Sequence, residues 1–191
     1  IEKLKWAAII SFIVSFILLL GGGYLAKDRL PPYPGKVVDP EGKVLFLKSD
    51  IIDGQNAYQR YGLMDHGSVW GHGSQRGMEF SAKTLRYLGD SVRNYLANEE
   101  YGKSYASLDE LQKSIIDMKA TKELKANRYD PVKDTLTLTK AQVSSLEPIH
   151  QFWEKTFKEG ERRYGFLPGT IRLEEERLQI SRFFFWTAWV A

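Results

Sequence analysis

The sequence contains no cysteine, and it has only three histidines among its 191 residues. The absence of thiols excludes disulfide bonds, thiolate metal sites, iron–sulfur clusters and a covalently attached c-type haem. The chain also has no large excess of one charge, because its formal net charge is only +3. This small net charge and the scattered positions of the charged residues argue against a nucleic-acid-binding protein. Neither the P-loop nor the dinucleotide-binding glycine pattern is present.

One long apolar run lies near the amino terminus. No charged residue occurs between Trp6 and Ala26, and about 20 such residues at about 1.5 Å each cross a hydrocarbon core of about 30 Å. A cleaved signal peptide is the alternative, but its apolar core usually has about 7–15 residues, and no small-x-small cleavage site follows here. We therefore predict a transmembrane helix over residues 1–27, whose orientation the balanced flanking charges leave open.

After a proline-rich linker, residues 28–35, the pattern over residues 36–171 predicts a mainly α domain with minor β. Residues 36–38 and 43–47 are expected to form a β-hairpin around a Pro-x-Gly turn. Apolar spacing and capping motifs predict helices, and alternation predicts a short strand. The helices are expected over residues 51–61, 81–98, 108–127 and 140–160, and the strand over residues 135–138.

Two expectations concern buried residues. In the helix that Ser107-Leu108-Asp109-Glu110 is expected to open, the apolar stripe contains Leu108, Leu111, Ile115 and Met118. We expect this stripe to face the core. The three methionines, Met64, Met78 and Met118, are predicted to be core residues as well.

The segment 172–191 starts with charged residues and ends in an aromatic run. Its uncharged part, residues 183–191, is too short to span a bilayer, which takes about 20 residues. Solvent exposure of so many aromatic rings is unfavourable. We expect a helix whose end is either part of a truncated membrane helix or an aromatic-rich end at a membrane interface or against membrane helices. Both chain ends have the appearance of cuts, and we expect the sequence to be a piece of a longer protein.

A glycine-rich segment, residues 61–78, is the most distinctive stretch. Its glycines at 62, 67, 71, 73 and 77 predict a loop with positive φ angles, or with very close approach to a cofactor, a metal or another domain. His66 and His72 lie in this loop without the spacing of a helix-borne metal site, so hydrogen bonding to backbone is favoured over metal or haem ligation. His150 is interpreted as a packing or surface residue.

No catalytic group of residues can be assembled. Asp50 and Asp53 have the pattern of helix-capping acids, and residues 174–176 that of a solvated helix start favoured by the helix dipole. No nucleophile, base and orienting residue occur together. We therefore predict no catalytic residue and no cofactor-binding residue in this sequence.

Several blocks of the chain together resemble a known family. They are Asp50-Ile51-Ile52-Asp53-Gly54-Gln55, Gly67-Ser68-Val69-Trp70-Gly71-His72-Gly73-Ser74, residues 122–131, residues 135–138, and Phe184-Phe185-Trp186-Thr187-Ala188-Trp189. In this order they are similar to the amino-terminal region of single-chain, quinol-dependent nitric oxide reductases, over essentially the whole chain. The blocks 67–74 and 184–189 are specific in combination.

The resemblance implies a bacterial inner-membrane enzyme of the haem–copper oxidase superfamily, which reduces nitric oxide to nitrous oxide and water with electrons from quinol. Low-spin haem b, high-spin haem b and non-haem iron would be bound by transmembrane helices beyond Ala191, and this segment would hold no redox centre. Its partners would be that catalytic core, quinol and the lipid bilayer, without nucleic acid. The domain would face the periplasm, or the outside of the cell membrane, and cover the core.

The resemblance also gives the glycine-rich segment a meaning. In the relatives that take electrons from cytochrome c, a haem c subunit carries Cys-x-x-Cys-His shortly before a turn similar to Gly71-His72-Gly73. At those positions this sequence has Leu63, Met64, Asp65, His66 and Gly67. The resemblance thus implies a cytochrome-c-like helical domain without haem, with a small β-hairpin insertion. It also implies a calcium ion bound through backbone carbonyls of Gly73 and Gln75, although an aromatic residue is usual at the second position.

Two other interpretations stay open. One is a stand-alone, membrane-anchored periplasmic binding or sensor module, and the other is a degenerate cytochrome c subunit that pairs with a separate catalytic chain. A gene that continues past Ala191 with apolar spans carrying histidines would favour the single-chain reductase. A stop codon close to that residue would exclude it.

Overall fold

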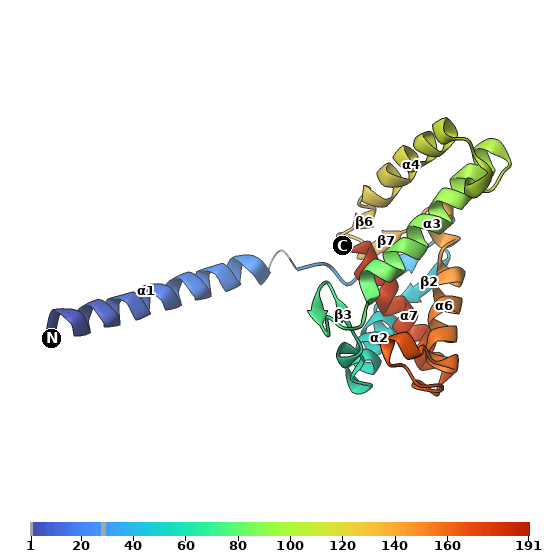
Figure 1. Ribbon diagram of the computed structural model, residues 1–191. Helices are drawn as coiled ribbons and strands as arrows, with labels where there is room; N and C mark the ends of the chain where they lie inside the picture. The colour runs from blue at the N-terminus through green and yellow to red at the C-terminus, as the bar shows by residue number, and fades with distance from the viewer. Residues whose placement is uncertain (1, 28–29) are drawn as a thin grey trace. The chain divides into compact units, whose positions relative to one another are not determined.

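The computed structural model describes residues 2–27 and 30–191, and the chain divides into two units, residues 1–32 and 33–191 (Figure 1). The first unit contains α1, Glu2–Lys27, of which no residue is buried. This helix is long and apolar enough to cross a membrane, and apolar side chains on all of its sides suit a lipid environment. The predicted amino-terminal apolar helix is therefore present. Residues 28 and 29 of the predicted linker lie outside the described residues.

The second unit is mainly α, as predicted. α2 begins ahead of the predicted residue 51, because the Asp50 carboxylate accepts a hydrogen bond from the Leu47 N–H at 2.7 Å and so completes a first turn. The α-helices are α2 Lys48–Arg60, α3 Phe80–Tyr101, α4 Glu110–Lys125, α5 Lys140–Val143, α6 Leu146–Glu159 and α7 Glu174–Trp189, and the 3₁₀ turns are η1 Leu63–Asp65, η2 Tyr105–Ser107 and η3 Arg162–Tyr164.

Two small sheets accompany the helices. The predicted hairpin is confirmed, since β1 pairs antiparallel with β2, and β7 extends it in a four-stranded sheet of order β2-β1-β7-β6. The second sheet, of order β4-β3-β5, lies in the glycine-rich segment. The strands are β1 Lys36–Val38, β2 Val44–Leu47, β3 Gly67–Val69, β4 His72–Gly73, β5 Met78–Glu79, β6 Tyr129–Asp130 and β7 Thr135–Thr137.

The helix α7 lies in the middle of this unit, packed against α2, α3 and α6 (Figure 1). Ile180, Phe183, Phe184, Phe185 and Trp186 are all buried there. A helix with apolar side chains on every side is stable only when it is surrounded. The neighbouring helices of the same unit already shield these rings from water, so burial of the rings does not require a membrane. The expected position of this end at a membrane interface or against membrane helices stays a prediction.

The crossing of α2 and α7 depends on Gly54. A Cβ atom at this position would overlap the main-chain carbonyl oxygen of Gln179 and come within 2.9 Å of the Cβ of Phe183. Glycine is therefore required for the two backbones to approach this closely. Close to this crossing, the Tyr61 hydroxyl donates a hydrogen bond to the Glu176 carboxylate at 2.6 Å. The end of α2 is thus fixed to the first turn of α7.

The helix predicted over residues 140–160 is divided into α5 and α6. Thr139 and Gln142 form the predicted capping box at its start. The Ser145 hydroxyl then donates to the Gln142 carbonyl oxygen at 2.6 Å, and this side-chain hydrogen bond competes with continuation of the helix. Pro148 falls in the first turn of α6, where its missing N–H has no helical partner to lose.

The buried face of α4 differs from the prediction. The helix is capped by Asp109 and not by Ser107, and Ile116 and Ala120 are its buried residues. Leu111 and Met118 are 73% and 67% exposed. The expectation that they face the core is wrong, because α4 packs along α3 and a helix with one neighbour buries only the side facing it.

A buried arginine connects α7 to α6. The Arg177 guanidinium donates to the Glu154 carboxylate at 2.5 Å and to the carbonyl oxygens of Ile171 and Arg172 at 2.8 and 2.7 Å. The hydrogen bond from Arg177 lowers the pKa of Glu154, although burial acts in the opposite direction. The carboxylate is therefore the favoured form in the folded protein.

This pair gives a pH-dependent prediction. Glu154→Gln should lower the thermal unfolding midpoint at about pH 7 and have a smaller effect at about pH 3. A carboxylate with a lowered folded pKa stabilises the fold fully above its unfolded pKa, about 4.3, and loses that contribution as the pH falls through the folded pKa. Unfolding followed by circular dichroism measures this. Glu159→Gln, which removes an exposed pair with Lys155, is the matched control and should change little. Equal destabilisation at both pH values would contradict the assignment.

Candidate functional site

The glycine-rich segment, residues 61–78, has regular structure: the 3₁₀ turn η1 and strands of the three-stranded sheet β4-β3-β5. Gly62 ends α2 in the left-handed region with φ 60°, as predicted. After η1, the strand β3 pairs antiparallel with β4 and parallel with β5. Sequence alternation does not reveal these strands, because each has only two or three residues.

Contacts inside this segment require several of its glycines. A Cβ atom on Gly77 would overlap the carbonyl oxygen of His66, and one on Gly73 would overlap that of Gly67. A Cβ atom on Gly67 would lie 2.7 Å from the Phe80 ring. The close approach that we predicted is therefore made by the backbone of the segment itself. Contact with another domain is not needed to explain the glycine at position 73.

Trp70 attaches the segment to α7. Its backbone has φ 53°, in the left-handed region that non-glycine residues seldom occupy. Its indole Nε1 donates to the Thr187 carbonyl oxygen at 2.9 Å, and its main-chain N–H donates to the Ser81 hydroxyl at 3.1 Å. The Trp70 ring lies 5.5 Å from that of Trp186, which stacks on Tyr33 at 4.1 Å. The two sequence blocks that carry the resemblance most specifically thus contact each other.

The histidines make separate, ordinary contacts. The His66 ring packs against Phe166 with 5.1 Å between centroids, and His72 Nδ1 lies 3.1 Å from the Trp70 carbonyl oxygen. His150 has a buried Nδ1 without a hydrogen-bond partner among the described residues. Over residues 2–27 and 30–191, no group of three or more histidine, aspartate or glutamate side chains is placed to hold a metal ion.

The residues at the positions that the resemblance assigns to the haem-attachment motif, 63–67, differ in their burial. Leu63 is buried as an apolar side chain, whereas Met64 and Asp65 are exposed. Met64 was predicted to be a core residue, and this was wrong, since η1 turns its side chain to the surface. Gly67, at the position that the resemblance assigns to the proximal histidine, has no side chain to offer to an iron atom.

Aromatic side chains fill the interior next to this motif. Five fully buried rings lie here, from Phe80, Trp153, Phe157, Phe166 and Phe184. Phe80 stacks on Phe184 with 4.8 Å between centroids and 6° between planes, and the Trp153 indole donates to the Thr84 hydroxyl at 3.1 Å. Interiors are packed too densely to admit a large ring without displacing side chains. The residues present therefore do not fit a haem c group.

Tyr58 is the group with the largest change in acidity near the segment. Burial raises its pKa to about 12, and the carboxylates of Glu79 and Asp65 add to the effect. Its hydroxyl has no hydrogen-bond partner in the described part of the chain, and its ring packs edge-on against Phe80 with 5.9 Å between centroids. A phenol with this pKa stays protonated at neutral pH, so Tyr58 packs the core and does not serve as a base.

These features define a class of protein. A helical unit with no thiol for haem attachment, and with an interior filled by aromatic rings beside its glycine-rich segment, has the features expected of a cytochrome-c-like domain without haem. Residues 34–191 match the family described as the cytochrome c-like domain of the NorB subunit of nitric oxide reductase, and the chain belongs to this family. No curated protein matches the sequence. The family agrees with the resemblance identified from the sequence, and the fold class is confirmed.

The glycine contacts lead to a stability prediction. Gly77→Ala should destabilise the protein by about 3 kcal/mol, because the new methyl group meets a main-chain carbonyl that cannot rotate away. Gly71 is the control, since it has φ 77° but open space around it, and Asn tolerates this conformation. Gly71→Asn should cost less than about 1 kcal/mol. Urea unfolding followed by tryptophan fluorescence measures both, and equal stability of the two variants would contradict the packing described.

Proposed function

We propose that this chain is the amino-terminal part of a single-chain nitric oxide reductase that takes its electrons from quinol. In this proposal the domain covers the outer, periplasmic face of the catalytic membrane core and carries no redox centre. One observation supports it most strongly: a member of the nitric oxide reductase family has lost every haem-attachment residue and has filled the adjacent interior with aromatic rings.

The loss of haem fits a donor that is dissolved in the membrane. An enzyme fed by a soluble electron carrier needs an external relay, whereas quinol diffuses in the bilayer and meets membrane-bound haem directly. The external domain is then free to lose its cofactor, provided that its core remains packed. The stacked rings of Phe80 and Phe184 meet this condition. Haem b, high-spin haem b and non-haem iron would all belong to the remainder of the enzyme.

The exposed side of the glycine-rich segment is the proposed contact with the catalytic core. Met64 and Trp70 are 46% and 42% exposed there, and these residue types are enriched at protein interfaces. Trp70 is held in place by its hydrogen bond to the Thr187 carbonyl oxygen, so the surface is formed before any partner binds. A preformed surface loses little conformational entropy on binding.

Calcium fits this proposal only as a shared ion. The carbonyl oxygens of Gly73 and Gln75 are the candidate ligands from this chain, and calcium takes about 6–8 oxygen ligands. The described residues add no cluster of carboxylates. Most of the ligands would therefore come from the catalytic core, and the domain by itself should not bind the ion tightly.

The absence of a redox centre is tested directly on the chain. The protein, purified with its amino-terminal helix from a host that attaches c-type haem, should give a blank pyridine haemochrome spectrum, because no thiol is present to form the thioether bond. A c-type signal would overturn the proposal. Sequencing the gene beyond Ala191 is the second readout, and apolar spans that carry histidines are expected. A stop codon would favour the sensor or separate-subunit alternatives.

The contact surface is tested in the intact enzyme. Met64→Glu should reduce quinol-dependent nitric oxide reduction by about tenfold, since it places a charge in a contact that loses its water. Leu167→Glu is the matched control, because Leu167 is 72% exposed and lies outside the segment, and it should leave turnover unchanged. Turnover measured with a nitric oxide electrode at saturating quinol decides between them. Equal rates for both variants would exclude this surface.

A further inference from the structure

A cleft lies between α2, the glycine-rich segment and α7, and we call it the α2 cleft. Its volume is about 340 Å³, within the range of about 300–1,000 Å³ that small-molecule sites occupy. Of the described residues, no aspartate, glutamate, lysine or arginine lines it. An ion would lose its water here without meeting an opposite charge, so an uncharged ligand is favoured. The lining includes Tyr33, Gln55, Tyr58, Trp70, His72 and Trp186.

Gln55 supplies hydrogen-bond donors to the α2 cleft. The Tyr33 hydroxyl donates to Gln55 Oε1 at 3.2 Å, and this contact fixes which end of the side-chain amide is turned to Tyr33. The Nε2 group of Gln55 carries two N–H donors, and neither has a partner within the described ranges 2–27 and 30–191. A ligand oxygen in the cleft would complete this amide.

His72 supplies an acceptor to the same cleft. Its Nδ1 lies 3.1 Å from the Trp70 carbonyl oxygen. Since a carbonyl oxygen only accepts, Nδ1 must carry the proton, and in the neutral imidazole Nε2 is then the acceptor. Nε2 has no partner in the part of the chain that the structure describes. The backbone thus determines which nitrogen of this ring is able to accept from a ligand.

Trp70 gives the α2 cleft a flat apolar wall. Its side chain is 42% exposed, although its indole N–H is held by the Thr187 carbonyl oxygen. Residues with unfavourable backbone angles, such as the φ of 53° at Trp70, are frequent at ligand-binding sites. The rings of Tyr33 and Trp186 already stack on each other at 4.1 Å. Trp70 therefore offers the surface on which a further ring can stack.

Tyr58 is the lining residue that the fold does not explain. It is 5% exposed, and its hydroxyl has no hydrogen-bond partner among the described residues. Buried hydroxyl groups are nearly always paired, so an unpaired one points to a partner outside the protein. This hydroxyl is thus a second donor without an acceptor in the lining of the α2 cleft.

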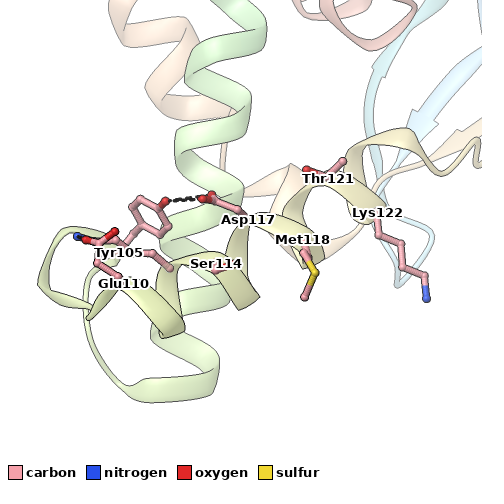
Figure 2. A pocket seen from close by; sticks show the side chains of 8 residues that line it. Tyr105, Glu110, Ser114, Asp117, Met118, Thr121 and Lys122 are labelled. Carbon is pink, nitrogen blue, oxygen red and sulfur yellow. Dashed lines mark hydrogen bonds and ion pairs between the residues drawn. The ribbon is translucent and has the colours of Figure 1, made fainter.

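The hollow beside α4 shows the contrast (Figure 2). It is larger, about 590 Å³, but its polar groups contact one another. The Tyr105 hydroxyl donates to both carboxylate oxygens of Asp117, at 3.0 and 2.9 Å, and Lys113 pairs with Glu110 at 3.2 Å. Groups that satisfy each other leave no hydrogen bond for a ligand to complete. Only the α2 cleft combines a stacking surface with donors and an acceptor that lack partners in the described ranges.

We propose that the α2 cleft binds a flat, uncharged aromatic molecule that carries a phenolic hydroxyl group. The ligand ring stacks on Trp70, its hydroxyl donates to His72 Nε2, and the same oxygen accepts from Gln55 Nε2. A phenolic hydroxyl serves both contacts because it is a donor and an acceptor at once. An ether lacks the hydrogen that His72 accepts, and a carboxylate brings a charge that no lining group neutralises.

This proposal does not depend on the proposed function. Met64 and Trp70 also belong to the surface proposed to contact the catalytic core, so the two proposals are tested on different material. Contact with the core is measured in the intact enzyme, and ligand binding is measured on this chain alone. Failure of one test therefore leaves the other proposal standing.

Binding is measured by equilibrium dialysis of 2-naphthol against the chain, purified with α1 in detergent micelles. Gln55→Met keeps the length of the side chain and removes its donors, so it should weaken binding by about tenfold. Gln151→Met is the matched control, because Gln151 is exposed on α6 and does not line the cleft. The micelles are the same in all samples, so partition of the probe into detergent cancels. No saturable binding to the unchanged chain, or equal binding to both variants, would overturn the proposal.

Two further probes and one variant test the chemical class. 2-Methoxynaphthalene has the same rings without the hydroxyl hydrogen and should bind about tenfold more weakly than 2-naphthol, while the charged 2-naphthoate should bind more weakly than either. In His72→Phe, which has a ring but no acceptor, the preference for the hydroxyl over the methoxy compound should disappear. Circular dichroism should show unchanged helix content. Equal binding of the three probes, or an unchanged preference in His72→Phe, would also overturn the proposal.

Discussion

The near contact of two main chains at Gly54 is the constraint on which the rest of the domain depends. Because α2 and α7 cross with no side chain between them, α7 sits deep enough for α3 and α6 to pack on its other sides. The glycine-rich segment leaves the end of α2, so the same crossing sets its position beside α7. Trp70 can then reach the Thr187 carbonyl oxygen. One glycine thus allows both the burial of α7 and the attachment of the loop.

Aromatic side chains fill the interior of this cytochrome c-like domain. A haem provides a large flat apolar surface around which helices pack. In this domain, Phe80, Trp153 and Phe184 supply such surfaces as separate rings, and aromatic pairs of this kind add about 0.5–1.5 kcal/mol each beyond their buried area. The glycine-rich segment has a structural role, since Gly67, Gly73 and Gly77 allow its strands to pack at backbone distance.

Local signals in the sequence predicted local structure well. The capping box at Thr139, the left-handed Gly62 and the β1–β2 hairpin all follow from nearby residues. The burial of α7 inside the domain could not be predicted from the sequence, because an apolar run has the same pattern whether lipid or protein surrounds it. The exposure of Leu111 depends on how many helices pack against α4, which its own sequence does not encode. The turn at Gly62 follows from its own neighbours, but Gly73 and Gly77 are required because each lies against the carbonyl oxygen of a residue several positions away, Gly67 and His66 respectively, which local sequence does not reveal.

The distance along the chain between α7 and its partners has a consequence for synthesis. Trp70 and Thr187 are 117 residues apart, and the rings of Phe80 and Trp153 have no partner in Phe184 until that residue has been made. The core therefore closes only when nearly all of residues 33–191 are available. Contacts between such distant residues slow folding, and exposed apolar surface favours aggregation meanwhile. In a nascent chain, Phe80 and Trp153 would thus lack their contacts with α7 until that helix is made, and a truncation that removes α7 would remove the helix on which α2, α3 and α6 pack.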